Sequence, residues 1–354
     1  MKFIHIADVH LGAIPDANQP WGTKRGKEIW NSLYHIIEVC NEEKAELLLI
    51  AGDLFHRQPL LRELKELNYY FTKLTMTRVV IIAGNHDYIG TRSFYSGFEW
   101  DKKVHMFLKD TLEILDLPEL NTQIYGLSYL QQDITEPLYD TIKIEKNNRI
   151  HILLAHGGDE RNIPINRKSL EGAGFDYVAL GHIHKPELIS SRMAYAGSLE
   201  PMDKTETGER GYILGQIHKT GEATTRIVFV PASIRQYRRL TVEVNQEMTN
   251  GKLLDHIREI ITTQGTQHIY QFIIQGFRDE QIHFDREAIK SLGNILEVTD
   301  RSVPDYNFDA LCHENEDNMI GMFIRQIREK ANQDEVVEKA LYYGIEALLG
   351  AKDT

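Results

Sequence analysis

The chain has 354 residues, which exceeds one domain of ordinary size, so we expect two domains or one large domain with an appended module. With 42% hydrophobic and 26% charged residues, the composition is that of a folded protein and excludes a disordered or collagen-like chain. The net charge of −12 argues against a uniformly basic nucleic-acid binder, although it leaves room for a local basic groove.

No apolar run approaches the roughly 20 residues that a membrane span requires, so we expect no contact with a membrane. The first ten residues carry an Asp and two His where a signal peptide needs an apolar core. We therefore expect a cytoplasmic protein. Cys40 and Cys312 lie far apart in the sequence and predict two free thiols rather than a disulfide framework.

The first half of the chain repeats a short apolar run followed by an amphipathic stretch of helical period, which predicts an α/β fold. Nearly continuous apolar residues within each run are typical of strands buried on both faces. The predicted strands are Phe3–Ala7, Leu47–Ala51, Val79–Ala83, Ile150–Ala155 and Tyr177–Leu180. Helices are predicted over Lys27–Lys44 and Leu60–Leu74.

Three later runs are predicted as antiparallel strands that complete the first domain: Ala194–Ala196, Gly211–His218 and Thr224–Val230. A connector at 231–235 then leads to a second, smaller α/β unit. Its predicted elements are strands at 239–244, 270–275 and 296–300 and helices at 251–262 and 286–292. Two helices, Asp317–Lys330 and Asp334–Leu349, are predicted for the end of the chain. We therefore divide the chain into a catalytic domain (1–233), a capping domain (234–304) and a C-terminal helical segment (305–354).

Polar residues follow each of the five predicted strands of the first half. The five groups are Asp8-Val9-His10, Gly52-Asp53, Gly84-Asn85-His86-Asp87, His156-Gly157-Gly158 and Gly181-His182-Ile183-His184. A single Asp, Asn or His after a strand is usually a turn, a cap or a surface residue. Seven potential ligands placed alike after five strands, four of them histidines, instead predict a metal site. Because the carboxyl ends of strands in an α/β sheet share one edge, we expect them to converge in one crevice.

The types of ligand narrow the choice of metal. Two carboxylates, one amide oxygen and four imidazoles suit Mn²⁺, Fe²⁺ or Zn²⁺ and fit Ca²⁺ or thiolate-bound structural zinc poorly. Seven ligands are too many for one ion. Two divalent ions ~3.5 to 4 Å apart that share a bridging carboxylate would use them all, polarise a phosphoryl oxygen and convert a bridging water to hydroxide. We expect two such ions, with Mn²⁺ as the first choice and Fe²⁺ or Zn²⁺ as alternatives.

In order and strand context, these five groups resemble the five blocks of the calcineurin-like metallophosphoesterase superfamily. The resemblance implies an α/β fold in which a β-sandwich is flanked by helices and followed by a small α/β capping domain. It implies one metal held by Asp8, His10, Asp53 and His184 and a second held by Asp53, Asn85, His156 and His182. It also implies that His86 acts beside the scissile phosphate, stabilising charge or protonating the leaving oxygen, and that Asp87 orients the ring of His86.

Further stretches resemble the DNA-repair exonuclease group of SbcD-type and meiotic-recombination-type nucleases. Ile4–Gly12 is close to the first block of that group, and Gly52–His56 resembles its second block, which implies a catalytic role for His56. Tyr195–Pro201 followed by Gly208–Tyr212 resembles the signature beyond its last histidine block. This resemblance implies an exonuclease or endonuclease that cleaves DNA in repair by hydroxide attack on the phosphodiester.

Two other functions stay open. The chain could be a phosphoesterase for a nucleotide or sugar nucleotide, which the acidic net charge mildly favours. It could also be a scaffold that binds DNA ends with a largely idle metal site, while an ATPase partner does the work. The capping unit and the Tyr195–Pro201 block favour the nuclease.

Three partners follow from the sequence and the resemblance. DNA phosphates could be contacted by basic residues near the predicted crevice and the domain junction. These residues are Lys24, Arg25, Lys27, Arg57, Arg161, Arg167, Arg235, Arg238 and Arg239. The resembling nucleases dimerise through helices that correspond to Leu60–Leu74 and Thr91–Trp100, so a homodimer is expected. They also grip the coiled-coil base of an SMC-like ATPase with a C-terminal helical segment, which predicts such a partner for residues after about 305. The alternative is that the tail docks on its own capping domain.

Overall fold

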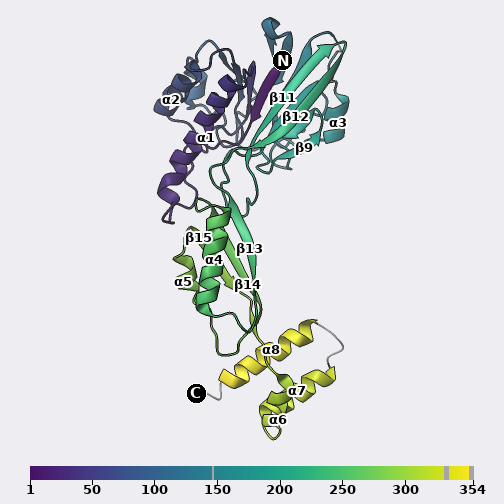
Figure 1. Ribbon diagram of the computed structural model, residues 1–354. Coiled ribbons are helices and arrows are strands. Elements are labelled where there is room, and N and C mark those ends of the chain that lie inside the picture. The colour runs from purple at the N-terminus through teal and green to yellow at the C-terminus, as the bar shows by residue number, and fades with distance from the viewer. Residues whose placement is uncertain (146, 331–334, 351–354) are drawn as a thin grey trace. The chain divides into compact units, whose positions relative to one another are not determined.

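The computed structural model describes residues 1–145, 147–330 and 335–350 (Figure 1). The chain forms two compact units, Met1–Tyr237 and Arg238–Thr354, so that the first unit ends four residues after the predicted boundary at 233. The predicted separation of residues 305–354 as a third part stays a prediction. None of the helices in the described residues is long and apolar enough to cross a membrane. Cys40 and Cys312 are both free, as predicted.

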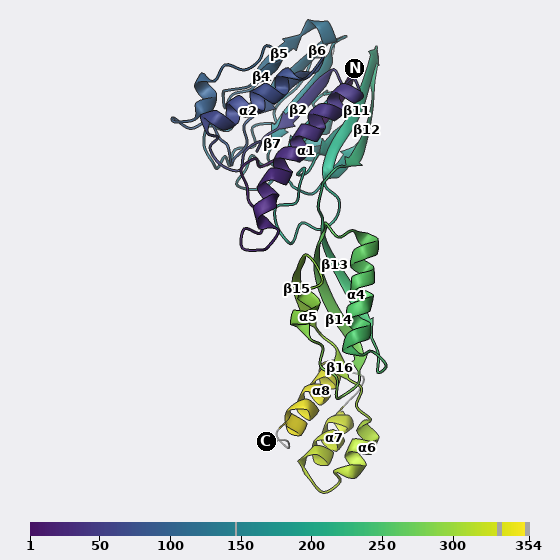
Figure 2. The same ribbon diagram turned by 60° about the vertical axis from the view of Figure 1, so that its left-hand side comes forward.

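The described strands of the first unit form two sheets of six strands each. Figure 2 labels strands of both sheets. In the first sheet the order is β12-β11-β1-β2-β3-β4, and the four strands from β1 to β4 run parallel. A hairpin of β11 and β12 adds to β1 in the antiparallel sense and turns at Gly221, where φ is 105° and glycine is favoured. The bounds are β1 (Lys2–Ile6), β2 (Leu47–Ala51), β3 (Arg78–Ile82), β4 (Val104–Met106), β11 (Gly211–Thr220) and β12 (Glu222–Pro231).

The second sheet has the order β5-β6-β7-β8-β10-β9, with a parallel centre and an antiparallel strand at each edge. The strand predicted at Ala194–Ala196 is β10, which lies in this second sheet, antiparallel to β9 and parallel to β8, whereas the other two predicted strands, β11 and β12, lie in the first sheet. The bounds are β5 (Glu113–Leu117), β6 (Thr122–Gly126), β7 (Ile150–His156), β8 (Tyr177–Gly181), β9 (Glu187–Ser190) and β10 (Met193–Tyr195).

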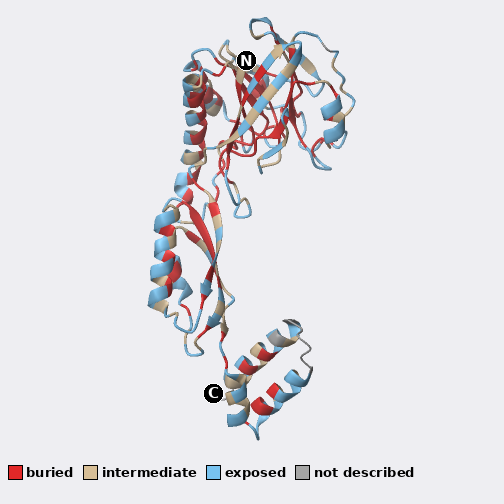
Figure 3. Ribbon diagram, turned by 45° about the vertical axis from the view of Figure 1, so that its right-hand side comes forward, coloured by how far each residue is buried: buried red, intermediate tan, exposed pale blue. Residues whose placement is uncertain are grey.

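The first unit has four layers held together by apolar side chains: two helices, the first sheet, the second sheet and a third helix. Helices α1 (Gly22–Glu42) and α2 (Leu61–Thr72) pack on the outer face of the first sheet, and α1 alternates buried and exposed surface along its length (Figure 3). The two sheets bury a second apolar cluster between them. A third cluster lies on the outer face of the second sheet, beneath α3 (Arg167–Gly172). The predicted α/β class, a sandwich flanked by helices, is confirmed.

The two sheets change how the site must be assembled. The five strands with polar ends were expected to share one sheet edge, but β1, β2 and β3 belong to the first sheet and β7 and β8 to the second. Because β2 packs against β7 and β8, the carboxyl ends of both sets still come together. Short turns complete the unit at η1 (Phe94–Gly97) and η2 (Pro118–Leu120).

The second unit begins with a small sheet covered by two helices. Its strands are β13 (Tyr237–Val244), β14 (Ile269–Arg278), β15 (Ile295–Asp300) and β16 (Val303–Pro304), and its helices are α4 (Asn250–Gln264) and α5 (Arg286–Lys290). The apolar face of α4, with Leu253, Ile257 and Ile261, packs on β14.

The described residues of the tail form three helices, one more than predicted. They are α6 (Phe308–Glu314), α7 (Met319–Lys330) and α8 (Glu335–Gly350); the predicted start of the last helix at Asp334 lies outside the described residues. Residues of all three helices and Tyr306 bury a small shared core. Large apolar side chains nevertheless stay exposed, namely Met319, Met322, Val336 and Tyr343.

Candidate metal centre

The seven predicted ligands converge at the carboxyl ends of the strands of both sheets. The first sheet brings Asp8 and His10 after β1, Asp53 after β2 and Asn85 after β3. The second sheet brings His156, the last residue of β7, and His182 and His184 after β8. Asp8, His10, Asp53, Asn85 and His156 are buried, while His182 and His184 are half-buried.

One set of ligand atoms gathers around His10. Potential ligand atoms of Asp8, His10 and His184 lie within 4.8 Å of one another. The Nε2 atoms of His10 and His184 are 3.0 Å apart, and His10 Nε2 lies 3.9 Å from Asp53 Oδ2.

A second set gathers around Asn85. Its Oδ1 lies 3.0 Å from His156 Nε2 and 3.1 Å from His182 Nδ1. The Asp53 Oδ2 atom is 3.5 Å from His156 Nε2, so the Asp53 carboxylate reaches both sets. This geometry matches the position that a bridging carboxylate requires.

The outer partners of the histidines fix where their lone pairs point. Ala51 O accepts from His156 Nδ1 at 2.8 Å, Asp159 Oδ2 from His182 Nε2 at 2.6 Å and Glu206 Oε1 from His184 Nδ1 at 2.6 Å. Since a carbonyl or carboxylate oxygen can only accept, each outer nitrogen carries a proton, and in the neutral ring the inner nitrogen then carries the lone pair. Inner lone pairs then face other acceptors, such as Asn85 Oδ1. A cation between them satisfies this arrangement, and the donor set fits divalent metal ions.

Buried charges at the centre shift the pKa of the ligands in opposite directions. Burial raises the pKa of Asp8 to about 6. Burial acts the same way on Asp53, but nearby imidazoles, His156 foremost, outweigh it and hold the pKa of Asp53 well below its usual range. Burial also opposes the charged form of His156, yet the Asp53 carboxylate raises the pKa of His156 to about 9. In the metal-free chain, a protonated His156 therefore supplies the positive charge that partly balances the Asp53 carboxylate.

Asp159 and Glu206 were missed from the sequence. Both pKa values are lowered: burial raises them, but the hydrogen bonds from His182 and His184 respectively outweigh it, so both groups are carboxylates. Asp159 follows His156 by only three residues, which is a weak signal for a role at the site. Nothing in the sequence marks Glu206.

The backbone at several ligand positions is strained. Among the ligands, Asp8 (φ 49°), His10 (φ 53°), Asp53 (φ 49°) and His182 (φ 93°) have the positive φ values that side chains other than glycine rarely adopt. Such conformations persist where the surrounding structure imposes them and cluster at functional sites. Close packing adds a further constraint, because a Cβ on Gly84 would collide with the Asp53 carboxylate.

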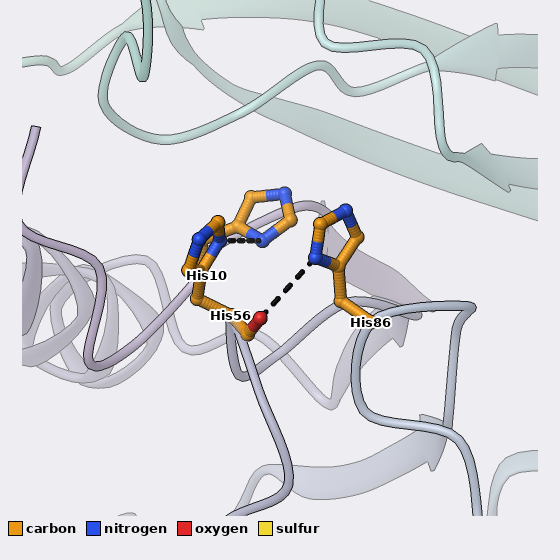
Figure 4. A group of neighbouring side chains, drawn as sticks. All are labelled: His10, His56 and His86. Atoms are coloured by element: carbon orange, nitrogen blue, oxygen red, sulfur yellow. Dashed lines mark hydrogen bonds between the residues drawn. The ribbon is translucent and has the colours of Figure 1, made fainter. Parts of the chain in front are cut away.

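The predicted catalytic histidines, His56 and His86, are exposed. Figure 4 shows them next to His10. His10 Nδ1 is 3.4 Å from His56 Nδ1, and the rings of His56 and His86 stack with their centroids 5.1 Å apart. His86 Nδ1 donates to the backbone oxygen of His56 at 3.2 Å. The structure thus places both imidazoles beside the buried ligands.

The predicted role of Asp87 in orienting His86 is wrong. The fully buried Asp87 carboxylate accepts from Gly84 N at 2.8 Å, from Phe55 N at 3.2 Å and from Tyr95 Oη at 2.8 Å. The ring of His86 is held by His56 instead. Asp87 therefore ties the loop after β3 to the loop after β2.

Four of the basic residues expected near DNA are bound to carboxylates of the first unit. Arg25 is fully buried against Glu28 and Glu200, and Arg235 forms a two-bond pair with Glu28. Arg57 pairs with Glu63, and Arg167 pairs with Glu187. Lys24, Lys27, Arg161 and Arg239 are exposed, and Arg238, half-buried, donates to Gln264.

Glu200 of the Tyr195–Pro201 block is likewise structural. It is fully buried and accepts from Ser32 Oγ at 2.7 Å and from Ile234 N at 2.6 Å. It therefore anchors the segment before β13 to α1.

Comparison with known proteins agrees with this geometry. Residues 1–186, just over half of the chain, match the family described as calcineurin-like phosphoesterase. The chain is also similar to the uncharacterized metallophosphoesterase YhaO of Bacillus subtilis (strain 168), with 29% identity over 304 residues. That alignment covers 79% of this chain and 73% of the Bacillus protein.

Proposed function

Because the chain belongs to the calcineurin-like phosphoesterase family, we propose that it is a two-metal phosphodiesterase that cleaves DNA. Phosphoester hydrolysis with divalent metal ions is the chemistry of the family, and the converging ligands fit it. DNA as the substrate is the further step, which rests on the resemblance to the SbcD-type nucleases and on the exposed side of the centre.

The ligands divide into two metal positions. One position has Asp8, His10, Asp53 and His184, and the other has Asp53, Asn85, His156 and His182. When bound, the two ions would supply charge stabilisation for the phosphoryl oxygens and a hydroxide nucleophile. The mixture of imidazole, carboxylate and amide ligands suits Mn²⁺ first, with Fe²⁺ or Zn²⁺ as alternatives.

His86 supplies the group that meets the leaving oxygen. Its Nδ1 donates to the backbone oxygen of His56, so the proton that meets the leaving oxygen is the one that the imidazolium form of His86 carries on Nε2. The ring of His56 stacks on the ring of His86, and both rings meet His10 in T-shaped contacts.

The observation that carries the DNA proposal is the exposed pair His56 and His86 next to a buried set of ligands. A phosphodiester within a polymer can approach such a centre from solvent without the rest of the chain entering a closed pocket. The blocks Gly52–His56 and Tyr195–Pro201 and the α/β unit after residue 237 resemble the DNA-repair nucleases at the same places in the chain.

A nucleotide or sugar nucleotide is the second candidate substrate. It is favoured by the ion pairs that engage Arg25, Arg57, Arg167 and Arg235, since these leave fewer cations for a phosphate backbone. A scaffold that binds DNA ends without cleaving them is the third.

Two partners are part of the proposal. In the homodimer, contacts would come from the exposed Tyr69 and Phe94, at 57% and 47% exposure, because Leu67, Phe71 and Tyr95 are buried within the first unit. The SMC-like ATPase would bind the exposed apolar side chains of α7 and α8.

Parallel assays test the proposal. The metal-free chain is reconstituted with Mn²⁺ or Mg²⁺ and assayed on linear duplex DNA, single-stranded DNA, a cyclic nucleotide and a chromogenic phosphodiester. Metal-dependent cleavage of DNA is expected, with the His86→Gln variant as the control for a contaminating nuclease. Turnover of the cyclic nucleotide alone would favour the small-molecule enzyme, and DNA binding without turnover of any substrate would favour the scaffold.

A further inference from the structure

Two carboxylates stand directly behind two histidine ligands of the second sheet. Asp159 Oδ2 lies 2.6 Å from His182 Nε2, and Glu206 Oε1 lies 2.6 Å from His184 Nδ1. We propose that Asp159 and Glu206 are positioning residues that each fix one histidine and thereby set the metal affinity of one of the two positions. The inference rests on the two-metal centre of the proposed function and is independent of DNA as the substrate.

Each carboxylate acts on the atom opposite the ligand atom. His182 presents Nδ1 toward Asn85 Oδ1 at 3.1 Å, while its Nε2 meets Asp159. His184 presents Nε2 toward His10 Nε2 at 3.0 Å, while its Nδ1 meets Glu206. A carboxylate on the outer nitrogen fixes the tautomer and the ring orientation and makes the inner nitrogen more basic.

The two histidines depend on these contacts because their side chains are less enclosed than that of the third histidine of this sheet. His182 and His184 lie in the loop after β8 and are half-buried, whereas the third histidine of this sheet, His156, is fully buried at the end of β7. His156 donates to a backbone oxygen, Ala51 O. When its hydrogen-bond partner is removed, a loosely packed side chain loses more of its fixed orientation than a side chain that is enclosed at the end of a strand.

The two carboxylates are themselves held differently. Glu206 has a side chain only 16% exposed, and its second oxygen accepts from Met202 N at 3.0 Å and lies 3.8 Å from Arg210 Nε. Asp159 has a side chain 49% exposed and accepts from Arg161 N and Asn162 N at 2.8 and 2.9 Å. Solvent screens the contact between Asp159 and His182 more than the contact between Glu206 and His184. We therefore expect substitution of Glu206 to lower metal affinity more than substitution of Asp159.

Metal binding to the metal-free, full-length chain tests the inference. Calorimetric titration with Mn²⁺ resolves the two binding steps for the parent chain and for Asp159→Asn, Asp159→Ala, Glu206→Gln and Glu206→Ala. Each alanine variant is expected to weaken one step by about 10- to 100-fold and to leave the other within about threefold. The near-isosteric Asn and Gln variants keep an acceptor without the charge, so a smaller loss is expected. Glu160→Gln and Glu209→Gln, at exposed neighbouring positions, are matched controls that remove the same charge and should change neither step.

A double-mutant cycle assigns each carboxylate to its histidine. On a His182→Ala background, Asp159→Ala should cost nothing further, whereas Glu206→Ala should still weaken the remaining step. The reverse is expected on a His184→Ala background. Additive losses within the Asp159 and His182 pair and within the Glu206 and His184 pair would overturn the inference.

Unfolding of the metal-free variants separates positioning from a structural role. Variants that bind Mn²⁺ less tightly while unfolding at the parent temperature support positioning, and parent-like affinity in both alanine variants overturns it. If an alanine variant does not fold, the Asn or Gln variant decides in its place. A parent chain that binds no Mn²⁺, Fe²⁺ or Zn²⁺ would overturn the metal centre itself, which distinguishes failure of the proposed function from failure of this inference.

Discussion

The two sheets of the first unit make unlike contributions to one centre. The first sheet supplies the carboxylates Asp8 and Asp53 and the amide of Asn85, so it carries the negative charge of the inner ligands. Beside them it also places His10. The second sheet supplies only imidazoles, and each of these has an acceptor behind its outer nitrogen. The first sheet therefore provides the negative charge of the centre, and the second sheet provides imidazoles whose orientation is fixed by hydrogen bonds. We expect substitutions in the two sheets to have different effects on metal binding and hydrolysis.

The largest effect is expected at Asp53, where the charge of the first sheet reaches both metal positions. Asp53→Asn should remove both ions and lower phosphodiester hydrolysis by at least ~10³-fold, because a neutral amide cannot bridge and balance two divalent ions. Metal content is measured by elemental analysis alongside the rate. Asp133→Asn, at an exposed position, is the control. Full occupancy of one ion in Asp53→Asn would mean that Asp53 is not the bridge.

A smaller loss is expected at His86, which also follows a strand of the first sheet and which we propose as a proton donor rather than a ligand. His86→Gln should keep both ions and slow hydrolysis by about 10²-fold, because it removes a proton donor. His35→Gln, with a side chain 54% exposed on α1, is the matched control. Unchanged activity would contradict the assigned role, and loss of metal would make His86 part of the ligand set.

Behind the first sheet, Tyr95 should affect stability more than turnover. Tyr95→Phe removes the hydroxyl that donates to the buried Asp87 carboxyl, whose pKa burial raises to about 6. We expect the free energy of unfolding to fall by about 1 to 3 kcal/mol and the rate to change only severalfold. Denaturant titration measures the free energy of unfolding, and Tyr69→Phe, at an exposed position, is the control. A hundredfold slower variant of unchanged stability would instead return Asp87 to a role in orienting His86.

No effect on hydrolysis is expected from the tail, which belongs to neither sheet. Deletion of Asn307–Thr354 should leave the metal content and the hydrolysis of a small phosphodiester intact while abolishing co-purification with the SMC-like ATPase. The cut removes α6, α7 and α8 together, and Tyr306 is the buried member of their shared core that stays with the second unit. Alanine at Met319 and Met322, both exposed, should weaken the same binding within the full chain. If the shortened chain loses its metals, the tail is part of the fold that supports the centre.

The sequence predicted which residues converge at the strand ends, because strand period and polar strand ends are local signals. Asp8, Asn85 and His182 could be recognised from their place after an apolar run, without knowing which sheet held the run. The division of these runs between two sheets was missed, since pairing depends on contacts distant in sequence. Short strands such as β5, in which exposed and half-buried residues alternate, gave no apolar run to detect.

Partners of charged groups were the least predictable part of the site. Glu206 lies 22 residues from His184, and Arg25 lies 175 residues from Glu200, so only the folded chain brings either pair together. The resemblance implied that Asp87 orients His86, yet the buried Asp87 carboxylate accepts from Gly84 N, Phe55 N and Tyr95 Oη. A resemblance in sequence gives the place of Asp87 in the chain but not the direction in which its side chain points.

The left-handed backbone at Asp8, His10, Asp53 and His182 has a consequence for the lifetime of the protein. The fold holds these residues in backbone conformations of high energy and brings their lone pairs close together, and both effects destabilise the metal-free protein. An ion that binds only the folded state stabilises that state by mass action. At 100 times its Kd, one ion adds about 2.7 kcal/mol. Heat resistance and protease resistance should therefore follow the supply of metal, so that scarcity of metal would shorten the survival of the chain as well as silence its chemistry.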